Sequence, residues 1–309
     1  MKNYSFLVSL LTDQNDYQQE QAKAAKETAQ RLGIDISILY ANNDPIAQSQ
    51  QLLSVIQSSS KPRPDGIVCQ PVGTGLSQVA SAAVAAGIGW AILRDVDYVT
   101  SLRSKHRSPV FSVSLDQEEV GRIQGRQFAR LLPEGGMILY IQGPSVNSNV
   151  QARITGMHST KPDNVQLRTL RGQWTQESGY EAVASWLRLS TSRQTPITLV
   201  AAQNDNMALG ARKAFEQNTS GAERERWSHL LYTGCDACPG KGQEWVHKGL
   251  LSASIVMPPT AGLALEMFAR FLSGGSLPPE RTMVTPVSYP EIEKLSQGRS
   301  SYFQHPHKA

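Results

Sequence analysis

The sequence predicts an α/β protein made of two lobes, each built on a doubly wound parallel sheet. Its 309 residues are about twice the length of an ordinary domain, which favours two domains. Short apolar runs alternate with longer segments of helical periodicity, as in a parallel sheet covered by helices. The alternation starts again at Asp116, so each part of the chain is expected to form its own sheet.

In the first part of the chain, residue types mark the ends of the predicted helices. An Ala-rich helix stops at Gly33, because glycine readily takes the left-handed conformation that ends many helices. Asp44 is a preferred N-cap, and Pro45 fits the first position of the next helix. The expected strands are 6–11, 34–40, 66–69 and 90–93, and the expected helices are 17–32, 45–56 and 76–86.

The second part repeats this alternation from Asp116 to Gly234. Helices are expected at 118–132, after Asn147, at 177–189 and at 207–217, and strands at 137–141, 165–170, 197–202 and 230–234. We expect Asp205 to cap the helix that begins near Met207, which leaves Asn204 facing a binding cleft.

Composition excludes several classes of protein. Hydrophobic residues make up 40% of the chain and charged residues 18%, which is ordinary for a folded globular protein and not for a disordered one. A net charge of +4 over this length is too dilute to indicate nucleic-acid binding. The apolar run ending before Asp13 is too short to span a membrane, and the polar residues that follow it do not form a leader-cleavage site. We therefore expect no signal peptide in this chain.

The three cysteines, Cys69, Cys235 and Cys238, do not make a disulfide-rich scaffold. Cys235 and Cys238 have the spacing of a redox pair or half a zinc site, but no second pair accompanies them. A redox pair usually opens a helix, whereas this one runs into Pro239 and Gly240. We expect a local disulfide or two free thiols, and no metal.

Polar and aromatic side chains follow the predicted strands, where parallel α/β sheets bind their ligands. Arginine forks and amides can pair with neighbouring hydroxyls, and aromatic faces can stack on the C–H faces of a sugar. The candidates for such contacts are Asn15, Tyr17, Gln18, Arg94, Arg153, Trp174, Asn204 and Asp236. No nucleophile and base pair is implied, so no catalytic residue and no cofactor are expected.

Three segments have a residue order that resembles one known family. They are residues 65–71 (Asp-Gly-Ile-Val-Cys-Gln-Pro), residues 142–156 from Gln-Gly-Pro to Arg-Ile-Thr-Gly, and residues 202–210 (Ala-Gln-Asn-Asp-Asn-Met-Ala-Leu-Gly). This order is similar to that of the type I periplasmic sugar-binding proteins, the ribose-binding group in particular. The resemblance spans almost the entire chain, and the third segment is the most specific.

The resemblance implies a solute receptor for an ABC importer, a monomer that acts outside the cytoplasm with a membrane permease. It implies two lobes joined by a three-crossover hinge that close over a carbohydrate or polyol. The lobes would be residues 1–114 with 258–284, and residues 115–257 with 285–309, and the predicted helix 260–272 returns to the first lobe.

Three positions depart from the ribose-type pattern. Gln18 takes the place of a second stacking aromatic residue, and Leu93 takes the place of a carboxylate that commonly precedes the arginine. Met257 takes the place of a glutamine that usually reaches the ligand from the hinge. We count Gln18 and Met257 among the ligand-binding positions. A ribose hydroxyl facing Leu or Met would be left unpaired at a cost of ~1–3 kcal/mol. A deoxysugar, a cyclitol and an acidic sugar are all compatible with Arg94, Arg153 and the lone Asp236.

Other readings of the sequence are less favoured. The ligand-sensing domain of a LacI-type repressor shares the expected architecture, but a helix-turn-helix segment would have to precede the first strand, so no nucleic-acid partner is expected. A sensor domain of a membrane receptor would look identical to a transport receptor. Gly73 and Gly75 hint at a dinucleotide loop without its third glycine. His305 and His307, near the end of the chain, are expected to be frayed rather than metal ligands.

Overall fold

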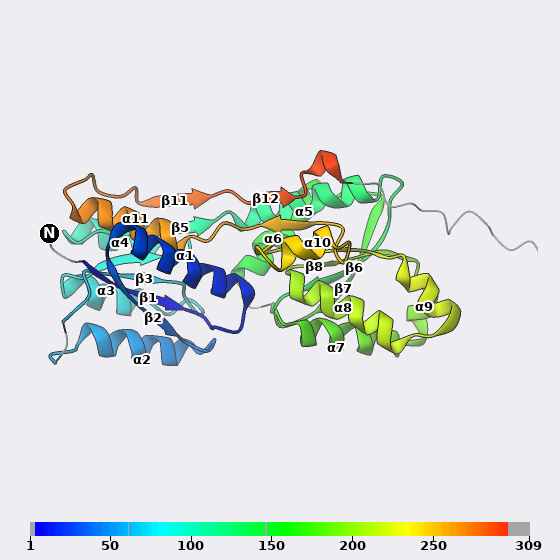
Figure 1. Ribbon diagram of the computed structural model, residues 1–309, viewed down its shortest axis with the longest axis horizontal. Coiled ribbons are helices and arrows are strands. Elements are labelled where there is room, and N and C mark those ends of the chain that lie inside the picture. Colours follow the sequence, from blue (N-terminus) through cyan, green and yellow to red (C-terminus); the bar gives the residue numbers. More distant parts are fainter. Residues whose placement is uncertain (1–3, 61, 146, 296–309) are drawn as a thin grey trace, which may run out of the picture. The chain divides into compact units, whose positions relative to one another are not determined.

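In the computed structural model, residues 4–60, 62–145 and 147–295 are described. Contacts divide the chain into two compact units, and each is an α/β layer structure (Figure 1). Unit 1 comprises residues 1–116 and 258–285, and unit 2 comprises residues 117–257 and 286–309. The chain therefore passes between the units three times. In the described part of the chain, no helix combines the length and the hydropathy needed to cross a bilayer.

Unit 1 is a six-stranded parallel sheet in the order β11-β5-β4-β3-β1-β2. Its strands are β1 (Ser5–Leu10), β2 (Asp35–Tyr40), β3 (Gly66–Cys69), β4 (Gly89–Ile92), β5 (Val110–Leu115) and β11 (Arg281–Val284). Its helices are α1 (Asp16–Leu32), α2 (Pro45–Ile56), α3 (Ser77–Ala85), α4 (Tyr98–Lys105) and α11 (Ala261–Leu272).

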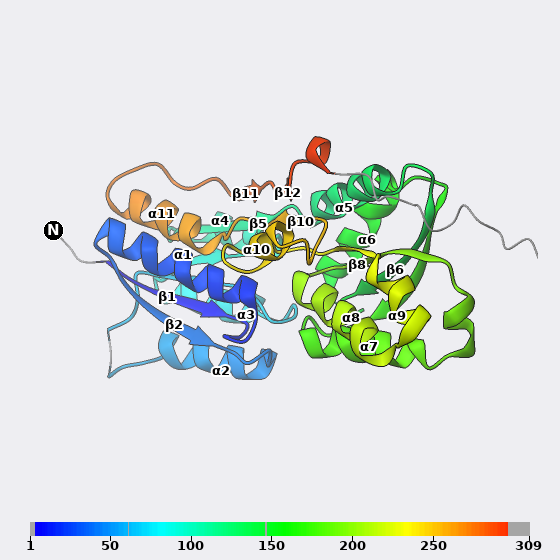
Figure 2. The ribbon, with the colours of Figure 1, turned by 45° about the vertical axis from the view of Figure 1, so that its right-hand side comes forward.

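Alternation along the strands of unit 1 divides its core into two layers. Phe6 and Val8 of β1 point to the side covered by α1 and α11, which lie next to each other in both views (Figures 1 and 2). Leu7, between them, points to the side covered by α2, α3 and α4. Both faces of the sheet are therefore buried, which explains why β3 and β4 read as continuous apolar runs.

Unit 2 has a four-stranded parallel sheet in the order β7-β6-β8-β9 and a separate antiparallel pair, β10-β12. The strands are β6 (Gly136–Gln142), β7 (Val165–Arg171), β8 (Ile197–Ala202), β9 (Leu231–Thr233), β10 (Ser254–Val256) and β12 (Val287–Tyr289). The helices are α5 (Gln117–Leu131), α6 (Ser148–Thr160), α7 (Gln176–Leu187), α8 (Asp205–Asn218), α9 (Gly221–Ser228) and α10 (Gly242–His247).

The central strand β6 also sends alternate side chains to two cores. Ile138 and Tyr140 pack with residues of α5 and α6, whereas Leu139 and Ile141 pack with residues of α7 and α8. Two short 3₁₀ helices, Ser190–Gln194 and Ile292–Lys294, complete the unit. This arrangement brings the loops after β6, β7 and β8 to one edge of the sheet, because the strands are parallel.

Several predicted elements match the structure closely. Strand β8 covers the predicted residues, and α2 begins at Pro45 with the Asp44 side chain accepting from the backbone N–H groups of Ile46 and Ala47. Helix α1 ends at Gly33, whose φ of 62° is left-handed as expected. The sequence analysis did not include α4, β5, α9, α10, β10, β11 and β12.

Candidate ligand-binding site

In unit 1, Asn15 and Gln18 form the N-terminus of α1. The Asn15 side-chain oxygen caps the helix by accepting from the backbone N–H of Gln18, at 3.2 Å. The buried Gln18 side chain accepts from the backbone N–H of Leu11, also at 3.2 Å. Gln18 thus ties the start of the helix to the end of β1, and its side-chain oxygen is engaged within the protein.

Tyr17 lies beside a buried glutamine that the sequence analysis did not single out. Gln21 donates to the Tyr17 hydroxyl at 3.0 Å and to the Thr260 hydroxyl at 3.2 Å, and its oxygen accepts from the backbone N–H of Ala261. The Tyr17 hydroxyl lies 3.4 Å from the carbonyl oxygen of Pro258. These bonds fix α1 to the start of α11. A polar residue within an Ala-rich helical face was the available signal.

Arg94 follows β4, and its guanidinium forms few hydrogen bonds. Its Nη1 donates to the carbonyl oxygen of Gly73 at 2.8 Å, while its Nε is buried without a hydrogen-bond partner. Burial lowers the pKa of the Arg94 guanidinium from its ordinary value. The neighbouring Asp95 is paired with Arg281 instead of with Arg94.

In unit 2, Arg153 of α6 is only 5% exposed. Its Nε donates to the side-chain oxygen of Gln117 at 2.8 Å, its Nη1 to the backbone oxygen of Gln203, and its Nη2 lies 3.2 Å from the sulfur of Met257. The guanidinium carbon stands 5.7 Å from the centre of the Trp174 ring. Three of the sequence-predicted residues, Arg153, Trp174 and Met257, are therefore neighbours within this unit.

Trp174 is held in an unusual backbone conformation with a φ of 67°. Its half-buried ring packs on Gly143, where an added Cβ would lie 2.2 Å from the ring. Its carbonyl oxygen accepts from the Asn204 side chain at 2.8 Å. A left-handed tryptophan is strained, and such conformations persist where surrounding contacts enforce them, often at binding sites.

The prediction that Asp205 caps α8 is wrong, whereas ligand contact by Asn204 stays a prediction. Asn204, not Asp205, is the N-cap of α8, and its side-chain oxygen accepts from the backbone N–H of Met207 at 2.9 Å. The Asp205 carboxylate accepts instead from the backbone N–H of Ala237 and from the hydroxyl of Ser254, at 2.8 and 2.6 Å. Both side chains are almost fully buried. Asp205 is unavailable for capping because it anchors the loop after β9.

Asp236 lies in that anchored loop. It is buried, with a φ of 115°, and its backbone N–H donates to the carbonyl oxygen of Ile255. Next to it, Cys235 and Cys238 are buried free thiols and not a disulfide. Burial raises the pKa of the Cys235 thiol well above its ordinary value, so this sulfur is neutral and unreactive at physiological pH.

A buried polar network that the sequence analysis missed supports Arg153. The Gln203 side chain accepts from the backbone N–H of Gly143 at 3.0 Å and donates to the Tyr140 hydroxyl at 3.1 Å. That hydroxyl donates to Gln124, which donates in turn to the carbonyl oxygen of Ala202. A glutamine at the end of an apolar strand was the available signal, because a buried amide requires partners.

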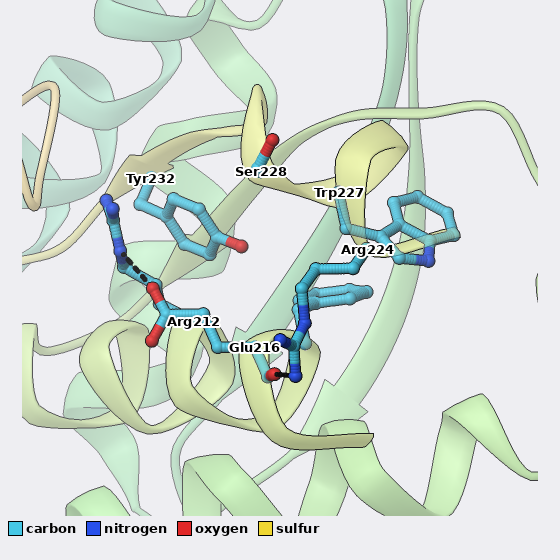
Figure 3. Close-up of a pocket in the computed structure, with 7 residues that line it drawn as sticks. Arg212, Glu216, Arg224, Trp227, Ser228 and Tyr232 are labelled. Atoms are coloured by element: carbon cyan, nitrogen blue, oxygen red, sulfur yellow. Dashed lines mark hydrogen bonds and ion pairs between the residues drawn. The ribbon is translucent and has the colours of Figure 1, made fainter. Parts of the chain in front are cut away.

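A separate small cavity of about 50 Å³ lies in unit 2 between α8 and α9 (Figure 3). None of the nine predicted ligand residues lines it; the lining residues are Arg212, Phe215, Glu216, Arg224, Trp227, Ser228 and Tyr232. Its arginines donate to Glu216 and to backbone carbonyl groups. A volume of this size is too small for a sugar.

Among the residues that the structure describes, no three His, Cys, Asp or Glu side chains are grouped closely enough to hold a metal ion. The predicted fraying of His305 and His307 falls outside the described residues.

Comparison with known proteins identifies the family. The model of the periplasmic binding protein domain matches residues 6–276. The chain belongs to this family. Periplasmic binding proteins of this kind are solute receptors and not enzymes.

A curated relative of this periplasmic binding protein is a Rhizobium meliloti protein named for rhizopine binding. It is 28% identical over 193 residues, which is 60% of this chain and 58% of the relative. The aligned part of the chain thus spans somewhat more than half the length of that relative.

Solved structures share the fold. An ABC transporter periplasmic solute-binding protein from Actinobacillus succinogenes, with bound D-allose, has a TM-score of 0.79 at 20% identity, covering 94% of this chain and 98% of that one. The arabinose-binding component from Shewanella sp. ANA-3 has a TM-score of 0.77 at 22% identity, covering 99% and 100%. The protein therefore has the type I periplasmic binding protein fold, with parallel sheets in two lobes.

Proposed function

We propose that this protein is a receptor that captures a sugar or a sugar-like polyol for an ABC importer. The observation that carries the proposal is the group in unit 2 where a buried arginine fork stands 5.7 Å from the strained, half-buried ring of Trp174. A fork of N–H donors suits neighbouring hydroxyls, and the ring suits the apolar face of a sugar. The solved relatives with bound D-allose and L-arabinofuranose support this ligand class.

We assign contact with the solute to six side chains that offer a hydrogen-bonding group, a charge or an aromatic ring. These are Asn15, Tyr17 and Arg94 of unit 1 and Arg153, Trp174 and Asp236 of unit 2. Gln18, Asn204 and Met257 are assigned to positioning, because their hydrogen bonds hold Leu11, Trp174 and Arg153 respectively.

The mechanism follows from the division of these groups between two units. Solute binds to one lobe, and the second lobe closes over it at the three chain crossings, so that the closed form is what the permease recognises. The lobe limits of residues 1–114 with 258–284, and 115–257 with 285–309, belong to this proposal. So do a monomeric state, a location outside the cytoplasm and the absence of a nucleic-acid partner.

A thermal-shift screen over pentoses, hexoses, cyclitols and uronic acids tests the proposal. A solute present at 100 times its Kd stabilises the folded protein by ~2.7 kcal/mol, which raises the melting temperature measurably. A hit should show no turnover when the solute is recovered and analysed. A complete panel without a shift, or product formation from a hit, would contradict the proposed function.

A further inference from the structure

The three chain crossings between the units are connected to one another by strand pairing in part. The chain crosses after Asp116, after Met257 and after Thr285. In unit 1, β11 leads into the third crossing and pairs with β5, which leads into the first. In unit 2, β12 follows the third crossing and pairs with β10, which leads into the second. Among the described strands, the first and second crossings are not joined in this way, because β5 and β10 belong to different sheets.

Arg153 joins the first crossing to the second within unit 2. Gln117 is the first residue of this unit after the first crossing, and Met257 is the last residue before the second. The Nε of Arg153 donates to the side-chain oxygen of Gln117 at 2.8 Å, and its Nη2 lies 3.2 Å from the sulfur of Met257. One side chain, only 5% exposed, therefore holds both ends of the segment 117–257.

The guanidinium of Arg153 is a fixed point within unit 2. Its Nη1 donates to the backbone oxygen of Gln203, just after β8. A Cβ on Gly121 of α5 would lie 2.1 Å from the carbonyl oxygen of Arg153, so α5 and α6 are in backbone contact. Farther along α5, Gln127 donates to the backbone oxygen of Ser254 in β10. Because these elements are fixed, a displacement of either crossing bends or breaks one of the bonds that Arg153 makes there.

We propose, on the basis of the receptor function above, that Gln117 and Met257 couple contact between the solute and Arg153 to movement of the chain crossings. Residues at the ends of elements absorb the backbone rotations of a hinge, and both residues stand at such ends. A solute that contacts Arg153 acts on the same guanidinium that holds the two crossings. Such coupling is reciprocal, so releasing a crossing from Arg153 changes the affinity for the solute as well as the movement of the units.

Distances between two spin labels, one on each unit, test the coupling. The labels are attached at Lys26→Cys of α1 and Lys213→Cys of α8, both exposed positions, whereas the native cysteines are buried. Without solute, Gln117→Ala should broaden the distribution of distances, because the first crossing loses its bond to Arg153. Gln117→Glu keeps an acceptor for Nε and should retain the parental width. Gln151→Ala, at an exposed glutamine of α6, is the control and should also retain it.

Calorimetry in the same variants measures the affinity for the solute found in the screen. Gln117→Ala should lower the affinity about five-fold or more, which is the lower end of usual coupling free energies. Met257→Leu should lower it by less, because the thioether sulfur that it removes is a weak acceptor. Met283→Leu, at an exposed methionine of β11, should leave it unchanged. Circular dichroism verifies that each variant is folded.

The outcomes separate coupling from a purely structural role. A residue that only stabilises the fold would lower the melting temperature on replacement and leave the distance distribution at its parental width. A parental width or a parental affinity in folded Gln117→Ala would therefore overturn the inference and leave the receptor function standing. If the parent protein binds no solute of the panel, the receptor function fails and the coupling fails with it.

Discussion

At the start of helix α8, two adjacent side chains, Asn204 and Asp205, have different hydrogen-bonding roles. Both Asn204 and Asp205 are good N-caps, so local preference could not choose between them. Residues distant in sequence determine which side chain caps the helix, because Ala237 and Ser254 both donate hydrogen bonds to the Asp205 carboxylate. Asn204 is left to cap α8, and its amide N–H group holds the carbonyl of Trp174.

Replacing Asn204 should therefore affect stability as well as binding. Asn204→Ala removes the cap and is expected to lower the free energy of unfolding by about 1 kcal/mol. Asn204→Asp retains an acceptor for the cap but loses the donor to Trp174, so it should cost less stability while still disturbing the ring. Urea titrations followed by circular dichroism and by tryptophan fluorescence separate the two effects. An alanine variant as stable as the parent would contradict the capping role.

Gly143 supports the ring of Trp174 through its lack of a side chain. In Gly143→Ala the new Cβ would overlap the ring at 2.2 Å, so the ring must move away from its place beside Arg153. We expect the affinity for the solute found in the screen to fall ten-fold or more. Gly75→Ala is the comparison for general glycine effects, because nothing lies within 4 Å of its added Cβ and its φ is not positive. Retained affinity in Gly143→Ala would mean that the ring is not a binding platform.

At the scale of elements, α5 and α6 approach so closely that their backbones are in contact. A Cβ at Gly156 would lie 1.9 Å from the carbonyl oxygen of Glu118, and one at Gly121 would lie 2.1 Å from that of Arg153. Glycine is required there because any side chain separates the two helices. Helix α6 carries Arg153 and α5 begins with its partner Gln117, so this packing also sets the position of the guanidinium.

Gly156→Ala should consequently weaken both the fold and the site. We expect a loss of about 1–3 kcal/mol of unfolding free energy, the usual range for overpacking. Thr155→Ala, at the exposed neighbouring position of α6, should be close to neutral. Thermal denaturation of the two variants tests this contrast, and equal melting temperatures would refute the close-packing argument.

An ion-pair network on α5 predicts that the stability of the fold depends on pH. Burial tends to raise the pKa of the Glu119 carboxyl, but bonds from Arg122 and Arg126 outweigh it and hold the pKa below its ordinary value. Because the folded-state pKa is depressed, the stabilisation is present above the unfolded pKa of about 4.3 and is lost as pH falls through the folded value.

Glu119→Gln should therefore lower stability at neutral pH by less than about 1 kcal/mol, as expected for partly exposed pairs. The difference from the parent protein should shrink as the pH falls below about 4. Urea midpoints at several pH values measure it, with the exposed Glu134→Gln as the control. A difference that does not change with pH would exclude the ionic origin.

The elements differ in how far their own residues determine them. Helix α2 carries its start signals in Asp44 and Pro45, and β8 is a continuous apolar run, so both could be predicted closely. Strand β11 is four residues long and half exposed, and Met283 is 60% exposed. It is a strand because it pairs with β5 across more than 160 residues of sequence, and no local pattern specifies that pairing.

At the scale of the whole molecule, the proposed function requires a change of shape. Saturating solute should lower the radius of gyration measured by small-angle scattering, because closure brings the two units together around the ligand. Arg153→Lys, at the same fractional saturation, is a useful comparison, since its weaker binding should shift the concentration at which compaction occurs. An unchanged radius at saturation would contradict capture by closure.

Three of the residues predicted to bind the ligand, Arg153, Trp174 and Met257, are neighbours within unit 2, and their contact with a ligand stays a prediction. Met257 follows β10 of the antiparallel pair, so its place beside Arg153 does not come from the parallel sheet. The buried glutamines that hold them could not be chosen from sequence, because a Gln has the same local preference whether it is exposed or buried. Gln203 and Gln21 acquire their roles only from partners contributed by other elements.

The alternation of apolar runs and helices determined, by itself, the α/β class, the parallel layers and the edge of each sheet at which the loops after the strands lie, because hydrophobic periodicity is a local property. The tertiary structure decided which of two good caps was used, that Cys235 and Cys238 are buried without a disulfide between them, and that Arg153 donates to Gln117 and to the backbone of Gln203. Those outcomes depend on which distant donors, acceptors and charges meet in space, and the order of residues along the chain does not specify such meetings.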